Sequence, residues 1–205
     1  MKSAFIGEVN YLQQLLDENH KQLGVEVVES ILEEIPYLFK GYLYYSPPMP
    51  PYQVEKKRIK GVNVETYYSF YYHLGLDRKN EKLKEELTII GSQAKNLIVR
   101  ENNPAIIGQK ESGELLYCYG EQDLQLALDV MFLIEKGVQD FYLAYPLNSL
   151  MPICRTIQRY RCRVTLFLPK DETLPLQFYP VVDSVEQIGN FWERESYSEG
   201  FSDNL

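Results

Sequence analysis

Residues 120–168 constrain the fold of this chain more than any other stretch of its sequence. Apolar residues recur at helical spacing over residues 124–134 and again over residues 150–160. Between these two segments, residues 141–144 form a short apolar run that suits a buried strand and is too short for a helix. Residues 162–168 are rich in β-branched and aromatic side chains and predict the next strand. The stretch therefore predicts the order helix, strand, helix, strand.

This order predicts the class of the fold. Two consecutive strands that are joined by a helix are parallel, and the crossover between them is right-handed. We therefore predict a three-layer α/β domain with a mainly parallel central sheet and helices on both faces. The strands of this sheet are predicted at residues 3–6, 41–45, 97–99, 141–144 and 162–168.

The other segments complete a single predicted domain, residues 1–195, which is followed by a polar tail at residues 196–205. Asn10 is predicted to cap the first helix. Two apolar runs within residues 105–119 predict a β-hairpin, and residues 176–182 predict an edge strand. Further helices are predicted at residues 25–39, 77–95 and 184–194.

The composition limits the partners and the compartment of the protein. The net charge is −8 and the sequence pI is about 4.9, so no global positive field attracts phosphate groups, and DNA binding is not expected. The N-terminal sequence is too polar for a signal peptide, and no apolar run approaches the roughly 18 residues that span a bilayer. Cys118, Cys154 and Cys162 lack metal-type spacing and predict buried, reduced thiols. We therefore expect a soluble, cytoplasmic protein.

Several strings of the sequence resemble the motifs of one protein family. AFIGEVN (residues 4–10) is similar to a first-strand motif F-I-D-G-x-N, and YLYYSPPMPP (residues 42–51) is similar to an aromatic second strand that ends in a proline-containing loop. Residues 120–168 are similar to a block K-G-x-D-x-x-L-A-x-D, strand, S-G-D-S-D-F-x-P, helix and strand. VEQIGNFWE (residues 185–193) is similar to a closing helix. The family is the NYN domain, in the LabA-like branch of the PIN-like nucleases.

This resemblance implies a metal-dependent ribonuclease scaffold. In such a fold, carboxylates at the carboxyl ends of parallel strands hold Mg²⁺ or Mn²⁺, which activates water and stabilises charge on the phosphate. This sequence departs from the pattern at the acids, because Gly7 stands at the first-strand aspartate, and Leu147 and Ser149 stand at both aspartates of the S-G-D-S-D-F string. We therefore predict a catalytically degenerate domain that holds no metal and has no cofactor.

Four residues are the remaining candidates for a catalytic site: Glu8, Asn10, Asp123 and Asp129. Asn10 and the two aspartates match the family's pattern, and Glu8 lies next to the missing first aspartate. The alternative function is therefore a metal-dependent ribonuclease with an unconventional acidic site that uses Mg²⁺ or Mn²⁺. The competing interpretation is structural, in which Asn10 caps a helix and the aspartates are ordinary helical acids. We favour the structural interpretation.

Two basic groups are candidates for RNA binding. Arg155 and Arg159 are four residues apart and share one helix face, and Lys56, Lys57 and Arg58 belong to the densest basic run, which we expect to form a loop. The competing interpretation is a solvated surface. Because the chain is acidic, a protein partner or self-association is the favoured mode of binding, with RNA as the alternative. The resemblance also implies a regulatory role in a bacterial cytoplasm.

Overall fold

The structure, a computed structural model, describes residues 1–46, 52–59, 62–69, 76–102, 105–109, 115–118 and 120–190. Side chains are described for residues 1–46, 81–102 and 122–190. Within this part of the chain, no helix has the length and apolar character needed to cross a membrane.

A six-stranded sheet, in which every pair of neighbours is parallel, forms the centre of the molecule. Its strand order is β10-β9-β8-β1-β2-β5. The strands are β1 (Lys2–Glu8), β2 (Leu38–Tyr45), β5 (Leu97–Glu101), β8 (Val138–Ala144), β9 (Arg163–Phe167) and β10 (Ser184–Glu186). The middle strands are apolar along nearly their whole length because both faces of the sheet are covered.

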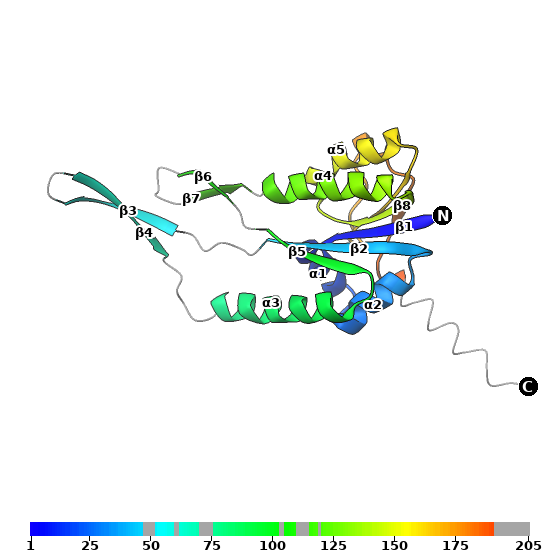
Figure 1. Ribbon diagram of the computed structural model, residues 1–205, viewed down its shortest axis with the longest axis horizontal. Helices are drawn as coiled ribbons and strands as arrows, with labels where there is room; N and C mark the ends of the chain where they lie inside the picture. Colours follow the sequence, from blue (N-terminus) through cyan, green and yellow to red (C-terminus); the bar gives the residue numbers. More distant parts are fainter. Residues whose placement is uncertain are drawn as a thin grey trace, which may run out of the picture.

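Helices cover the two faces of the sheet in separate layers (Figure 1). One layer contains α1 (Val9–Asp17), α2 (Val25–Glu33) and α3 (Leu76–Gln93), and the other contains α4 (Gly120–Glu135) and α5 (Leu147–Arg159). This arrangement confirms the predicted three-layer α/β fold.

Alternation along the strands divides the core between the two layers. On β1, Ala4 and Ile6 pack with residues of α4 and α5, whereas Phe5 packs with residues of α1, α2 and α3. All three side chains are fully buried. The sheet is therefore held from both sides, and the carboxyl ends of its strands come together at one edge.

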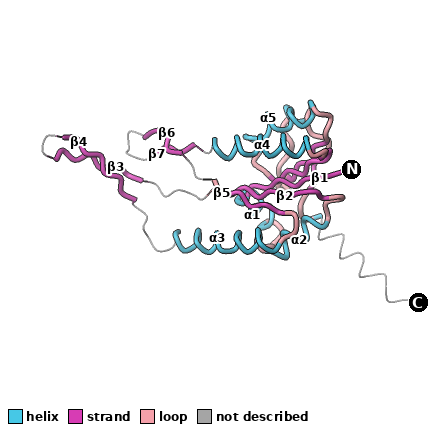
Figure 2. The backbone as a smooth tube through the Cα atoms, viewed as in Figure 1, coloured by secondary structure: helices cyan, strands magenta, loops and turns pink. Residues whose placement is uncertain are grey.

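Two antiparallel hairpins are inserted after the carboxyl ends of β2 and β5 (Figure 2). The first consists of β3 (Tyr52–Ile59) and β4 (Val62–Ser69). The second consists of β6 (Ala105–Gln109) and β7 (Leu115–Cys118), within the segment where a hairpin is predicted. The prediction of a loop for the basic run is wrong, because Lys56, Lys57 and Arg58 lie in β3 opposite residues of β4.

The predicted helix over residues 25–39 is too long. The observed helix α2 ends at Glu33, and β2 begins at Leu38. Tyr37 adopts a positive φ of 55°, and the backbone N–H of Ser3 donates to its carbonyl at 3.1 Å. Pairing with β1 therefore takes Leu38 and the residue after it into the sheet, although their apolar character fits either element.

The C-terminal segment also differs from the prediction. A short 3₁₀ helix, η1 (Leu176–Phe178), replaces the predicted edge strand, and β10 replaces the start of the helix predicted over residues 184–194. Residues 191–194 of that helix and the polar tail lie outside the described residues. Asp183 exchanges hydrogen bonds with Val164 through both its backbone N–H and its carboxylate, which guides β10 into parallel pairing with β9.

Candidate functional site at the carboxyl edge of the sheet

The strand order places a candidate site where β1 and β8 end. From β1, the chain builds outward through β2 to β5, and it then returns to the other side of β1 through β8, β9 and β10. Neighbouring strands whose connections leave in opposite directions form a crevice at their carboxyl ends, where open α/β sheets bind ligands. The residues that follow these ends therefore form the candidate site.

Glu8 is the last residue of β1 and caps α1. Its carboxylate accepts the backbone N–H of Tyr11 at 2.7 Å and Nδ2 of Asn10 at 2.9 Å. The residue is buried, and burial raises the pKa of the Glu8 carboxyl, although the hydrogen bonds from Tyr11 and Asn10 partly offset that rise. The prediction that Asn10 caps the helix is wrong, because α1 begins at Val9 and Asn10 supports Glu8 from the first turn.

A network of neutral side chains lies at the same edge. Ser46, directly after β2, donates from its hydroxyl to Oε1 of Gln122, and Nε2 of Gln122 donates to the hydroxyl of Tyr145 at 2.6 Å. All three residues are buried. The network joins the end of β2, the first turn of α4 and the end of β8, and it fills this part of the edge with paired, uncharged groups.

Two acids, Asp123 and Glu8, act on Tyr145 through their charge. Burial raises the pKa of Tyr145, the hydrogen bond from Gln122 lowers it, and the carboxylates of Asp123 and Glu8 raise it further. Asp123 itself is exposed in the first turn of α4. Of the four candidate residues, Glu8, Asn10 and Asp123 therefore lie around the same edge.

Asp129 has a different environment. It is buried, and its carboxylate accepts Nη2 of Arg100 at 2.8 Å, Nε of Arg100 at 3.2 Å and the hydroxyl of Tyr44 at 2.6 Å. The guanidinium of Arg100 also lies 5.5 Å from the ring centre of Tyr42. This carboxylate therefore joins α4 to β2 and β5 over the face of the sheet.

The positions at which the sequence resemblance leads us to expect two further aspartates lie in the first turn of α5. Leu147 is the first residue of this helix and packs against the core, and Ser149 follows in the same turn, which contains no acid. Among the described residues, no three His, Cys, Asp or Glu side chains are grouped so that they could hold a metal ion.

The two basic groups lie on separate elements. Arg155 and Arg159 are exposed on α5, as their spacing predicts, whereas Lys56, Lys57 and Arg58 belong to β3 in the first hairpin. Figure 1 shows α5 over the sheet and β3 well beyond the carboxyl edge. The two groups therefore lie on elements that are far apart in the fold.

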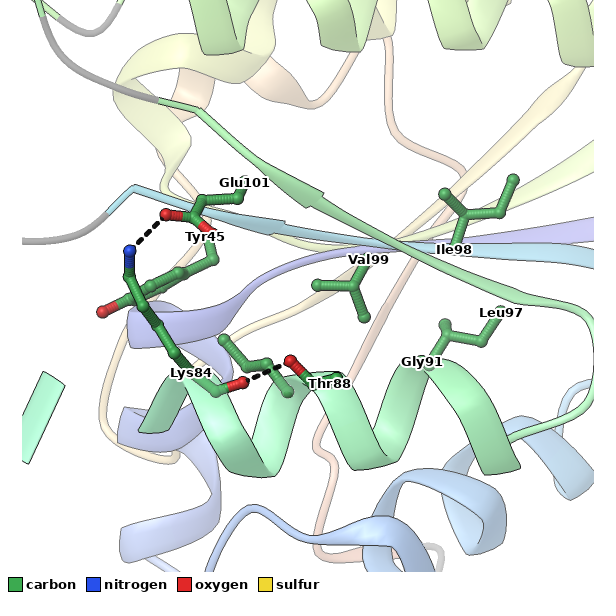
Figure 3. A pocket seen from close by; sticks show the side chains of 9 residues that line it. Tyr45, Lys84, Thr88, Gly91, Leu97, Ile98, Val99 and Glu101 are labelled. Atoms are coloured by element: carbon green, nitrogen blue, oxygen red, sulfur yellow. Dashed lines mark hydrogen bonds and ion pairs between the residues drawn. The ribbon is translucent and has the colours of Figure 1, made fainter. Parts of the chain in front are cut away.

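A cavity of about 420 Å³ lies between α3 and β5 (Figure 3). Nζ of Lys84 lies 2.5 Å from the carboxylate of Glu101 at one end of the cavity. Tyr45 also lines it, and the buried hydroxyl of this residue has no hydrogen-bond partner among the described residues. Nδ2 of Asn102, which follows β5, is also buried and finds no partner within the part of the chain that the structure describes.

Sequence reasoning missed most of the polar residues at this edge. Ser46, Asn102 and Tyr145 each come directly after a strand, so a polar residue at the end of a predicted strand was the available signal. For Gln122 no such signal exists, because a glutamine in the first turn of a helix is ordinary.

Comparison with known proteins adds a fold relationship. Neither the models of protein families nor the curated proteins gave a match. Among solved structures, the chain is similar to a protein of unknown function from Vibrio parahaemolyticus, with 12% sequence identity, a TM-score of 0.51 and coverage of 90% of each chain. At this level of identity, the similarity shows a shared fold and assigns no activity.

Proposed function

We propose that this protein is a catalytically degenerate NYN-like domain that acts as a regulatory or interaction module in the bacterial cytoplasm. Its partner is a protein or a second copy of the chain, and RNA is the alternative. The observation that carries the proposal is the neutral network of Ser46, Gln122 and Tyr145. It lies at the edge where a metal-dependent nuclease of this architecture needs several carboxylates.

The packing around Gly7 supports this proposal. A Cβ atom at this position would lie 3.0 Å from Cδ2 of Leu43 and 3.1 Å from the ring of Phe5, and both neighbours are fully buried. An aspartate at position 7 would therefore require these core side chains to shift by a few tenths of an ångström. This close packing leaves little room for a larger side chain at position 7, where the resemblance leads us to expect an aspartate.

The hydrogen bonds of Glu8 support it as well. Both carboxylate oxygens are used within the turn, one by Asn10 and the other by the backbone of Tyr11. A metal ion bound to Glu8 would compete with this cap, whose loss costs about 1 kcal/mol. The buried carboxyl also has a raised pKa, which disfavours the charged form that a metal ion requires.

Exposed apolar side chains favour a protein partner over RNA. Leu124, Leu128 and Phe132 follow one another at four-residue spacing on α4, with 62%, 56% and 44% of their surface exposed. Such a stripe is typical of a surface that contacts protein. The net charge of −8 opposes the approach of a phosphate backbone, which the exposed Arg155 and Arg159 alone do not offset.

A nuclease assay with Mn²⁺ on single-stranded RNA tests the catalytic part of the proposal. We expect no cleavage above background for the wild type. Asp123→Asn and Glu8→Gln serve as controls, because cleavage by a contaminating nuclease would be the same in the wild type and in both variants. Cleavage by the wild type that disappears in both variants would instead establish the metal-dependent ribonuclease.

Binding of single-stranded RNA at two salt concentrations tests the alternative partner. The proposal predicts no binding even at low salt. Binding that falls steeply with salt and is weakened by Arg155→Ala and Arg159→Ala together would replace the protein partner by RNA.

A further inference from the structure

Strand β5 forms one end of the sheet among the described strands, and it differs from the opposite end. The other terminal strand, β10, has only three residues, and a short edge strand is a common protection against unwanted pairing. β5 has five residues and begins with the apolar sequence Leu97, Ile98, Val99. It therefore offers a longer and more apolar edge for strand addition.

The hydrogen bonds of β5 show which backbone groups are directed to the open edge. The N–H of Gly41 donates to the carbonyl of Asn96 at 2.7 Å, and the N–H of Asn102 donates to the carbonyl of Tyr45 at 2.9 Å. Because bonded residues alternate along a strand, the even-numbered residues of β5 face β2. The N–H and C=O groups of its odd-numbered residues, Leu97, Val99 and Glu101, are directed away from β2.

Both faces of the sheet are hollow beside β5. On the α3 side, Leu97, Val99 and Glu101 line the cavity of about 420 Å³, and Figure 3 shows Val99 directed toward α3 and Ile98 toward the other face. On the α4 side, a second cavity of about 570 Å³ is lined by Ile98 and Arg100 of β5. Its apolar lining includes the exposed Leu128 and Phe132, which belong with Leu124 to the α4 stripe.

We infer that a second copy of this chain pairs with β5 along this edge, antiparallel and about a two-fold axis at Val99. In this register Val99 lies opposite Val99 of the other copy, and Leu97 lies opposite Glu101. All the odd-numbered residues then form hydrogen-bonded pairs, so the edge groups of the two copies satisfy one another. The inference rests on the proposed function and names the partner that the interaction module takes.

Charge supports a second copy as the occupant. Lys95 is exposed just before β5, and Glu101, which pairs with Lys84 of its own copy at 2.5 Å, ends the strand with 45% of its side chain exposed. The antiparallel register brings Glu101 of each copy beside the amino end of the other copy's β5, near Lys95, and the two-fold axis makes this contact twice. On the α4 side, Arg100 lies opposite Ile98 and already neutralises Asp129, so no like charges face each other directly.

The two copies would form one continuous sheet, with the hollows beside β5 becoming inter-subunit space. The α4 stripes approach this space from one face. One contact between the two copies would therefore cover both the α4 stripe and the edge of β5. A partner that bound only the stripe or only the edge would leave the other exposed.

The decisive experiment is sedimentation of the full chain from about 1 µM to about 100 µM, a range that detects a micromolar dimer. We expect a reversible dimer for the wild type. Val99→Pro removes an N–H that β2 does not use, so the sheet tolerates it, but it removes two inter-copy hydrogen bonds and should weaken the dimer at least about 30-fold. Val99→Thr keeps the N–H and should dimerise like the wild type.

A charge exchange provides an independent test if Val99→Pro does not fold, which its circular dichroism reveals. Lys95→Glu and Glu101→Lys should each weaken the dimer, by roughly tenfold for two equivalent contacts, and the double variant should recover most of the loss. The inference would be overturned if the wild type is a monomer at about 100 µM. It would also be overturned if the dissociation constant of the dimer does not change in Val99→Pro and in the charge variants. Either result would leave the absence of nuclease activity, which is measured separately, intact.

Discussion

Replacing Asp129 by asparagine separates a structural aspartate from a catalytic one. Asp129 is 5% exposed, and its carboxylate accepts two hydrogen bonds from Arg100 and one from Tyr44. Asparagine keeps the shape and one acceptor oxygen for Tyr44, but it removes the negative charge and places an amide donor near the guanidinium. The substitution therefore leaves Arg100 without its counter-charge.

The size of the effect follows from the exposure of the arginine. Breaking a buried ion pair costs about 3–5 kcal/mol. The side chain of Arg100 is 36% exposed, so water recovers part of this loss. We expect Asp129→Asn to lower the free energy of unfolding by about 2 kcal/mol.

Unfolding by urea, followed by circular dichroism, measures this change. Asp123→Asn is the matched control on the same helix, because Asp123 is exposed and its substitution should change stability by no more than about 0.5 kcal/mol. If both variants lose the same stability, or if Asp129→Asn loses less than about 0.5 kcal/mol, Asp129 does not have the structural role assigned to it.

Three further predictions concern the edge of the sheet and the core. The pKa of Glu8 is raised in the folded state above its ordinary value of 4.5, so folding takes up protons as the pH rises above 4.5. The stability of the wild type relative to Glu8→Gln should therefore fall as the pH rises from 4.5. Urea unfolding of both proteins at several pH values measures this difference, and a rise in relative stability would contradict the prediction. Gly7→Ala should destabilise the protein by about 1 kcal/mol, because the new methyl presses on Leu43, and an unchanged urea midpoint would refute the close packing. Cys154 and Cys162 are free and buried, and burial raises the pKa of Cys154 to about 12. Both thiols should therefore react with a disulfide reagent only after the protein unfolds. Fast labelling of the native protein would contradict their burial.

The sequence was sufficient for the elements whose signal is local. The alternation of helical and strand-like apolar spacing over residues 120–168 predicts α4, β8, α5 and β9 in the right order, because each spacing reports which residues of a short segment share a face. The parallel pairing of the strands follows from the same pattern, since a helix between two strands leaves no other simple connection. Burial of Cys154 and Cys162 was predicted in the same way, from the apolar segments around them.

Where a segment is apolar enough for two elements, long-range pairing decided between them. Leu38 suits a helix or a strand, and its register opposite Ser3 of β1 makes it part of β2. Ser184 begins a segment with helical spacing, yet pairing with Thr165 of β9 makes it the start of β10. Local spacing cannot distinguish these outcomes, because the competing energies come from the neighbouring strand.

The chemistry of the acids was likewise decided by tertiary contacts. Asp129 is a candidate catalytic residue on the sequence resemblance alone, but its carboxylate contacts Arg100 and Tyr44, which lie 29 and 85 residues away along the chain. Gln122 joins Ser46 across 76 residues. A carboxylate or an amide takes its role from the donors and acceptors around it, and only the folded chain brings those groups within hydrogen-bonding distance.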